Sequence, residues 1–308
     1  MTWVAWRVQR PQLLAALGAV AMVGVWLAAT GLVTGHDQTW KYWTDGDVYV
    51  LYALPGLLGL ALGTPLVAGE AGHGTQRLAW TQSISRTRWL AFKLLLGGLA
   101  AAALSAGLTV LLEWWTTAVS LGPMTDSGGF SGIRIEPAAF DLTGIAVVGY
   151  SLFAFLLGTA LGAVVRRPGW AFALGIPVFA FARLVVEDWV RPHLIAPVTY
   201  ASLSGIAPKA VLNGWLLNSG FVPAGRTSPA PGQTWQASPP DSYVTCSDQA
   251  RSPAADARCA ALAHVHVVYQ FQPASHYWEL QAAETAIFAG LALLLLGVTV
   301  IAVRRWSS

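Results

Sequence analysis

Six long apolar stretches, separated by polar segments, dominate the hydrophobic pattern of the chain. They cover approximately residues 11–33, 48–68, 89–112, 142–165, 169–186 and 284–303. A helix needs about 20 mostly apolar residues to cross the hydrocarbon core of a bilayer. The first stretch is too long for the apolar region of a signal peptide and no clear cleavage pattern follows it, so we interpret it as a span. The pattern predicts an all-α polytopic membrane protein with six transmembrane helices.

Composition supports a lipid environment. Of the 308 residues, 55% are hydrophobic and only 11% are charged, whereas about a quarter of the residues of a soluble domain are charged. The excess apolar surface therefore has to face lipid. The formal net charge is only +3, and the basic residues form no run or single face. We therefore expect membrane lipids around the protein and no nucleic acid partner.

The distribution of charge over the loops predicts the orientation. Cytoplasmic loops of membrane proteins carry an excess of Lys and Arg. One side collects ten of the 18 basic residues, namely Arg7, Arg10, Arg77, Arg86, Arg88, Lys93, Arg166, Arg167, Arg304 and Arg305. The same side has one clear acidic residue, Glu70, and the opposite side holds most of the acids. We expect both termini to lie on the cytoplasmic side of a bacterial plasma membrane.

The segment 191–281 differs in kind, because it is rich in Pro, Ser and Gly and contains both cysteines, Cys246 and Cys259. The predicted topology places it outside the cell, where a thiol pair can stay oxidised. We expect a Cys246–Cys259 disulfide, the alternative being two free thiols. The domain organisation is then 1–190 with five spans and a cytoplasmic coupling loop at 69–93, 191–281 as an extracellular domain, and 282–308 as the last span and tail.

One part of this outer segment has the alternation of a β-strand. Residues 264–271 alternate, so His264 and His266 would share one face. Two histidines without a third ligand nearby are weak evidence for a metal site. A polar strand face is the simpler interpretation, and we assign no metal.

The chain lacks the motifs of a nucleotide-hydrolysing enzyme. A Walker A loop needs a lysine directly after a glycine, and none of the three lysines, Lys41, Lys93 and Lys209, follows one. Zinc-protease and serine-hydrolase motifs are absent as well. We therefore expect no catalytic residue and no bound cofactor. ATP and Mg²⁺ would have to be bound by a partner subunit.

Several charged residues lie near the ends of the apolar stretches. They are Glu113, Arg183, Glu187 and Glu284, and Asp141 opens the fourth span. Arg183 and Glu187 are four residues apart and are placed to pair on one helix face. Charges at membrane depth are candidates for gating or for a substrate path. Structural pairs at the interface are the alternative interpretation.

The loop after the second span carries the most informative motifs. Glu70, Gly74, Thr75 and Arg77 are followed by Ser85, Arg86, Trp89 and Lys93. In this order the residues resemble the permease subunits of ABC-2-type exporters, in particular a group common in actinobacteria. In that family an acidic residue and a Gly-Thr pair open a short coupling helix that docks on the ATPase. Arg166-Arg167 between spans four and five extends the resemblance. An ordinary positive-inside loop is the alternative reading.

The resemblance implies a six-span subunit that dimerises, with itself or with a paralogue, and pairs with ABC ATPase subunits. It implies ATPase-coupling roles for Glu70, Gly74, Thr75, Arg77, Arg86, Arg166 and Arg167. The activity implied is ATP-driven export of an amphiphilic drug, peptide or lipid from the cytoplasm or inner leaflet. Two alternatives remain open: a membrane-anchored sensor or assembly subunit that acts through the extracellular domain, and a secondary transporter.

Overall fold

The computed structural model describes residues 2–33, 45–73, 86–118, 133–202, 207–223, 226, 240–247 and 252–305. The chain forms two compact units. The first unit comprises residues 1–132, 138–187 and 281–308, and the second comprises 133–137 and 188–280.

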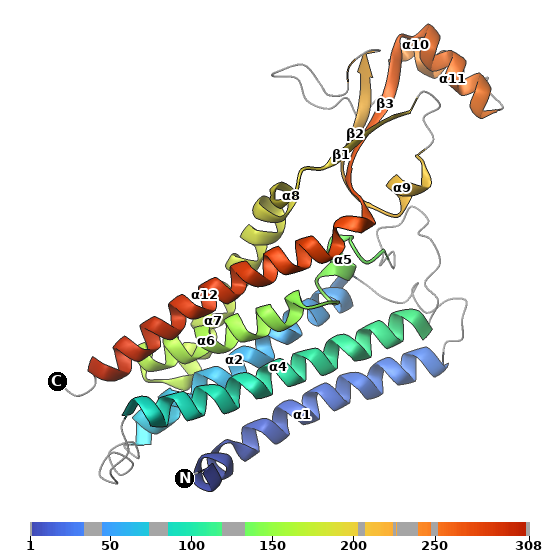
Figure 1. Cartoon of the computed structure of the whole chain (residues 1–308). Helices are drawn as coiled ribbons and strands as arrows, with labels where there is room; N and C mark the ends of the chain where they lie inside the picture. The colour runs from blue at the N-terminus through green and yellow to red at the C-terminus, as the bar shows by residue number, and fades with distance from the viewer. Residues whose placement is uncertain are drawn as a thin grey trace. The chain divides into compact units, whose positions relative to one another are not determined.

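Long apolar helices make up the first unit, and they lie side by side in Figure 1. They are α1 (Thr2–Val33), α2 (Asp45–His73), α4 (Arg86–Ala118), α6 (Ala146–Val165), α7 (Pro168–Val185) and α12 (Tyr277–Arg305). Within the described ranges, six helices are long and apolar enough to cross a membrane. This confirms the six predicted spans. Most of the helices extend beyond their apolar stretches, α12 by two turns at its start.

Helix α6 is the central helix of this bundle. In the candidate membrane span of α6, 72% of the apolar segment is buried, compared with 11% in the span of α1. It lies against α2, and glycines bring the two backbones together. A Cβ on Gly162 of α6 would lie 2.7 Å from the carbonyl oxygen of Thr64, and a Cβ on Gly63 of α2 would overlap the carbonyl oxygen of Phe155. Small residues at such positions let membrane helices approach closely.

The sequence pointed to only half of this contact. Gly158 and Gly162 have the spacing of a small-xxx-small pattern, and the structure shows that they face α2. Their counterparts Gly59 and Gly63 have the same spacing on α2. Not every glycine serves packing, since a Cβ on Gly107 of α4 would meet no atom within 4 Å.

The second unit contains a three-stranded antiparallel sheet in the order β1-β3-β2. The strands are β1 (Val198–Ser202), β2 (Trp215–Pro223) and β3 (Val265–Gln272). The central strand β3 begins one residue after the start of the predicted alternation at 264–271, so His264 lies in the turn before it and does not share a strand face with His266. The predicted all-α class is correct only in part: the chain is mostly helical, but the second unit contains this sheet. The sequence did not indicate its two edge strands, β1 and β2.

Short helices accompany the sheet, and a disulfide joins two of them. The unit also contains η2 (Val186–Val190, mostly in this unit), α8 (Arg191–Leu194), α9 (Lys209–Leu212), α10 (Asp241–Ser247), α11 (Pro253–Leu262) and η3 (Ala274–His276). Cys246 of α10 is bonded to Cys259 of α11, with the two Cα atoms 5.4 Å apart. Tyr243 and Ala260 pack beside this bond. The predicted disulfide is therefore confirmed.

The two histidines near β3 have different surroundings. His264 is exposed in the turn before the strand, with φ at 49°. His266 is buried inside the strand, and its Nε2 lies 2.7 Å from the carbonyl oxygen of Arg226. Among the described residues, no group of three or more His, Cys, Asp and Glu side chains is placed to hold a metal ion.

Candidate functional site

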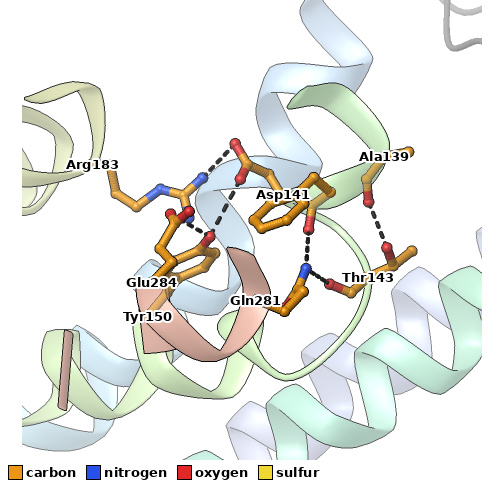
Figure 2. Close-up of polar contacts among 8 residues, drawn as sticks. Ala139, Asp141, Thr143, Tyr150, Arg183, Gln281 and Glu284 are labelled. Carbon is orange, nitrogen blue, oxygen red and sulfur yellow. Dashed lines mark hydrogen bonds and ion pairs between the residues drawn. The ribbon is translucent and has the colours of Figure 1, made fainter. Parts of the chain in front are cut away.

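Four buried polar side chains meet inside the first unit, and we call them the Arg183 cluster: Asp141, Tyr150, Arg183 and Glu284 (Figure 2). Asp141 directly follows the short helix α5 (Pro137–Phe140), and Tyr150 lies in the second turn of α6. Arg183 lies in the last turn of α7, and Glu284 lies on α12. The exposed fraction of these residues ranges from 1% for Glu284 to 8% for Arg183.

Arg183 is held by a carboxylate and an aromatic ring. Its Nη2 lies 2.8 Å from Oδ2 of Asp141. Its Cζ lies 3.6 Å from the centroid of the Tyr150 ring. A guanidinium over an aromatic face is attracted by the ring quadrupole, most strongly where water is excluded. The cation is therefore compensated on two sides within the apolar bundle.

Tyr150 connects this ion pair to α12. Its hydroxyl lies 2.7 Å from Oε1 of Glu284 and 3.3 Å from Oδ1 of Asp141. A hydroxyl carries a single proton, so it donates to one carboxylate at a time, and Glu284 is the nearer acceptor. Phe288 packs edge-on against the tyrosine ring, and Phe153 packs against Phe288 in turn.

The cluster has a physical consequence for motion of the helices. Removing one partner of a buried ion pair costs several kcal/mol, because the other charge stays in a medium of low dielectric constant. The ion pair of the Arg183 cluster joins α7 to Asp141, in the link that leads into α6. The hydrogen bond between Tyr150 and Glu284 joins α6 to α12. Any displacement that separates these helices therefore has to break or exchange these contacts together.

Gln281 lies one helical turn before Glu284 on α12. Its side chain holds the backbone of the link between α5 and α6. Its Oε1 accepts a hydrogen bond of 2.7 Å from the backbone N–H of Ala146, at the start of α6. Its Nε2 donates to the carbonyl oxygens of Phe140 and Thr143, at 3.2 and 3.0 Å. The N-cap residue of α6, Ile145, has no side-chain acceptor. Gln281 therefore supplies from α12 a cap that the local sequence lacks.

The structure unites two of the four predicted gating candidates. Arg183 and Glu284 meet through Tyr150, whereas Glu113 on α4 and Glu187 in η2 are partly exposed and are not members of the cluster as defined. The described ion pair of Arg183 goes to Asp141, and the pairing with Glu187 stays a prediction. Tyr150 and Gln281 were missed. Tyr150 is a polar residue inside the fourth apolar stretch, and Gln281 is a polar residue just before the sixth, and these positions were the signal that could have found them.

Most of the predicted coupling residues lie at the limits of the described chain. Gly74, Thr75 and Arg77 lie outside the described residues. Glu70 lies near the end of α2 and Arg86 is the first residue of α4. Their place on these helices leaves their predicted role untested.

Arg166 and Arg167 form the exposed link between α6 and α7. Arg166 adopts the left-handed conformation with φ at 59°, and its backbone N–H donates to the carbonyl oxygen of Gly162 at 3.0 Å. Gly162 faces Ala68 near the end of α2. Both arginines therefore lie at the same end of the bundle as the last turns of α2.

Comparison with known proteins gives one match. A family model described as ABC-2 membrane transporter related matches residues 2–191. This interval contains four of the six candidate spans in full and the fifth up to residue 191. It also contains three members of the Arg183 cluster, but not Glu284. No curated protein matches the chain, and no solved structure matches it.

Proposed function

The chain belongs to the ABC-2 membrane transporter related family, and we propose that it is the membrane-spanning permease subunit of an ATP-driven exporter. The family match over residues 2–191 is the observation that carries the proposal. The six apolar helices agree with it, because they supply a membrane-spanning bundle. The substrate class that fits is an amphiphile, such as a drug, peptide or lipid, moved out of the cytoplasm or inner leaflet.

The energy source in this proposal is an ABC ATPase in a separate subunit. That subunit binds ATP and Mg²⁺ and docks on the loop 69–93 and on the exposed pair Arg166-Arg167. A second copy of the chain, or a paralogue, completes the permease. The weakly buried helix α1, with only 11% of its apolar window covered, offers a face for this partner or for lipid.

The Arg183 cluster is the proposed gate element. Movement of the coupling loop reaches the bundle through α2, which packs closely on α6. Helix α6 in turn contributes Tyr150 to the cluster. A two-state transition needs packed contacts with two discrete arrangements. In the proposed mechanism the ion pair between Arg183 and Asp141 is intact in one state and exchanged in the other.

A second function is favoured by one observation. The family match ends at residue 191, and the second unit, with its sheet and disulfide, lies almost entirely beyond that point. A sensor or assembly subunit that works through this second unit is the alternative. It predicts that the chain functions without an ATPase.

Affinity purification of the tagged chain from its native membrane, followed by mass spectrometry and an ATPase assay, tests the proposal. We expect an ABC-type ATPase to co-purify in near-equal amount and to hydrolyse ATP. Stimulation of that activity would then identify substrates. Recovery of the chain without an ATPase, under conditions that keep other ABC complexes intact, would overturn the permease assignment and favour the alternative.

A further inference from the structure

Lys93 has an unusual environment for a lysine in a membrane-spanning segment. It lies in the candidate span Arg88–Trp114 and is only 4% exposed. Lysines near the ends of membrane helices usually extend their ammonium groups toward the headgroups. A buried ammonium is costly unless polar groups surround it. Because the Lys93 side chain is buried in the bundle, we expect its ammonium group to contact polar or aromatic groups there.

The ammonium group lies between α4 and the backbone of α2. Its Nζ donates to the carbonyl oxygen of Leu66 on α2, at 3.4 Å. The same Nζ lies 4.5 Å from the ring centroid of Trp89, one turn earlier on α4. Trp89 itself packs against the apolar cluster that includes Leu66 and Leu90. Lys93 thus connects two helices through a charge-assisted hydrogen bond.

The position of this contact along α2 is informative. Pro65 lies inside α2, directly before Leu66. A proline removes one backbone hydrogen bond of a helix and is a common site of bending. Lys93 contacts α2 at Leu66, the residue directly after this proline. It therefore holds the last two turns of α2, which run to His73, against the start of α4.

We propose that Lys93 is a positioning residue that makes the end of α2 and the start of α4 move as one body. The inference rests on the proposed function, because residues 74–85 between these two helix ends belong to the loop assigned to ATPase coupling. Without this contact, a push on the loop would bend α2 at Pro65. With it, the displacement is passed to both helices and through α2 to α6.

A distance between spin labels on the two helices tests this role. The described cysteines, Cys246 and Cys259, are bonded to each other, so added cysteines react selectively. Gly69→Cys and Leu95→Cys suit the purpose, because a Cβ at Gly69 meets no atom within 4 Å and Leu95 is 65% exposed. Electron–electron double resonance on the full chain in lipid nanodiscs then reports the separation of the helix ends.

Three further substitutions are compared in this labelled background. Lys93→Arg keeps the charge and Lys93→Met keeps the aliphatic stem. Phe92→Met is the matched control at the neighbouring position, which is 38% exposed. We expect one narrow distance distribution in the parent, in Lys93→Arg and in Phe92→Met, and a distribution at least twofold broader in Lys93→Met. Equal widths in the parent and in Lys93→Met would overturn the proposal. Lys93→Gln replaces the methionine variant if that protein does not fold.

The complex with the ATPase provides the second arm. Trapping the nucleotide with vanadate should leave the distance unchanged in the parent and shift it in Lys93→Met. A shift in the parent would show that the two helix ends move separately, and the proposal would fail. Because the first arm needs no ATPase, absence of that partner would count against the proposed function only.

Discussion

The hydroxyl of Tyr150 on α6 lies 2.7 Å from Oε1 of Glu284 on α12, although the two residues are 134 positions apart. The same hydroxyl lies 3.3 Å from Oδ1 of Asp141, and the guanidinium of Arg183 covers the tyrosine ring. One side chain thus contacts every other member of the Arg183 cluster. Tyr150 is therefore the position at which the cluster is most sensitive to a small change.

Tyr150→Phe removes only the hydroxyl. We expect a loss of about 1–3 kcal/mol in the free energy of unfolding, because a buried carboxylate loses its donor. Thermal unfolding of the purified protein in detergent measures the change. Tyr200→Phe on the edge strand β1 is the control, since Tyr200 is 44% exposed and surface changes stay within about 0.5 kcal/mol. Equal melting temperatures for the two variants would contradict the assignment.

A double-mutant cycle tests the ion pair between Arg183 and Asp141. Arg183→Met alone should cost about 3–5 kcal/mol, because Asp141 is left as a buried charge. The variant with both Arg183→Met and Asp141→Asn should lose less than the sum of the two single losses, by about 1 kcal/mol or more. Unfolding of all four proteins under one condition gives the coupling energy. Strictly additive losses would show that the pair contributes nothing specific.

The contact of α2 with α6 predicts a contrast between two glycines. Gly63→Ala places a methyl group on the carbonyl oxygen of Phe155, so α2 has to move away from α6. We expect a reduced yield of monodisperse protein by size-exclusion chromatography. Gly107→Ala meets no atom within 4 Å and should be neutral, or stabilising by about 0.5–1 kcal/mol from the helix preference of alanine. A similar loss in both variants would argue against glycine-mediated packing.

The proposed coupling role of the loop 69–93 predicts a separation of two activities. Glu70→Ala and Thr75→Trp should leave membrane insertion intact and should lower transport per ATP hydrolysed, because the loop no longer fits the ATPase. The assay is export and ATP hydrolysis by the same reconstituted complex, with a substrate identified by ATPase stimulation. Unchanged transport in both variants would remove the coupling assignment.

The disulfide of the second unit predicts the reactivity of its thiols. In native protein neither Cys246 nor Cys259 should react with an alkylating reagent until a reductant is added, because both sulfurs are bonded. Closure of a loop of this length contributes about 3 kcal/mol. Cys246→Ser combined with Cys259→Ser should therefore speed proteolysis of the second unit. Ready labelling of the native protein would contradict the bond.

The sequence by itself determined the number and approximate limits of the membrane helices. A span needs a fixed length of apolar residues, which can be counted along the chain. The disulfide was equally accessible, because the chain has only two cysteines. The alternation at 264–271 predicted a strand close to β3, which covers Val265–Gln272, whereas the edge strands β1 and β2 left no comparable pattern.

Only the tertiary structure decided which polar residues meet. Arg183 of α7 pairs with Asp141 in the link between α5 and α6, and Gln281 caps a helix that precedes it by more than a hundred residues. Such contacts depend on how each helix is rotated about its own axis. Spans that are apolar on every side carry no periodic face from which this rotation can be read. The close packing of Gly63 and Gly162 on the neighbouring backbones selects the rotation, and that selection appears only when the helices are assembled.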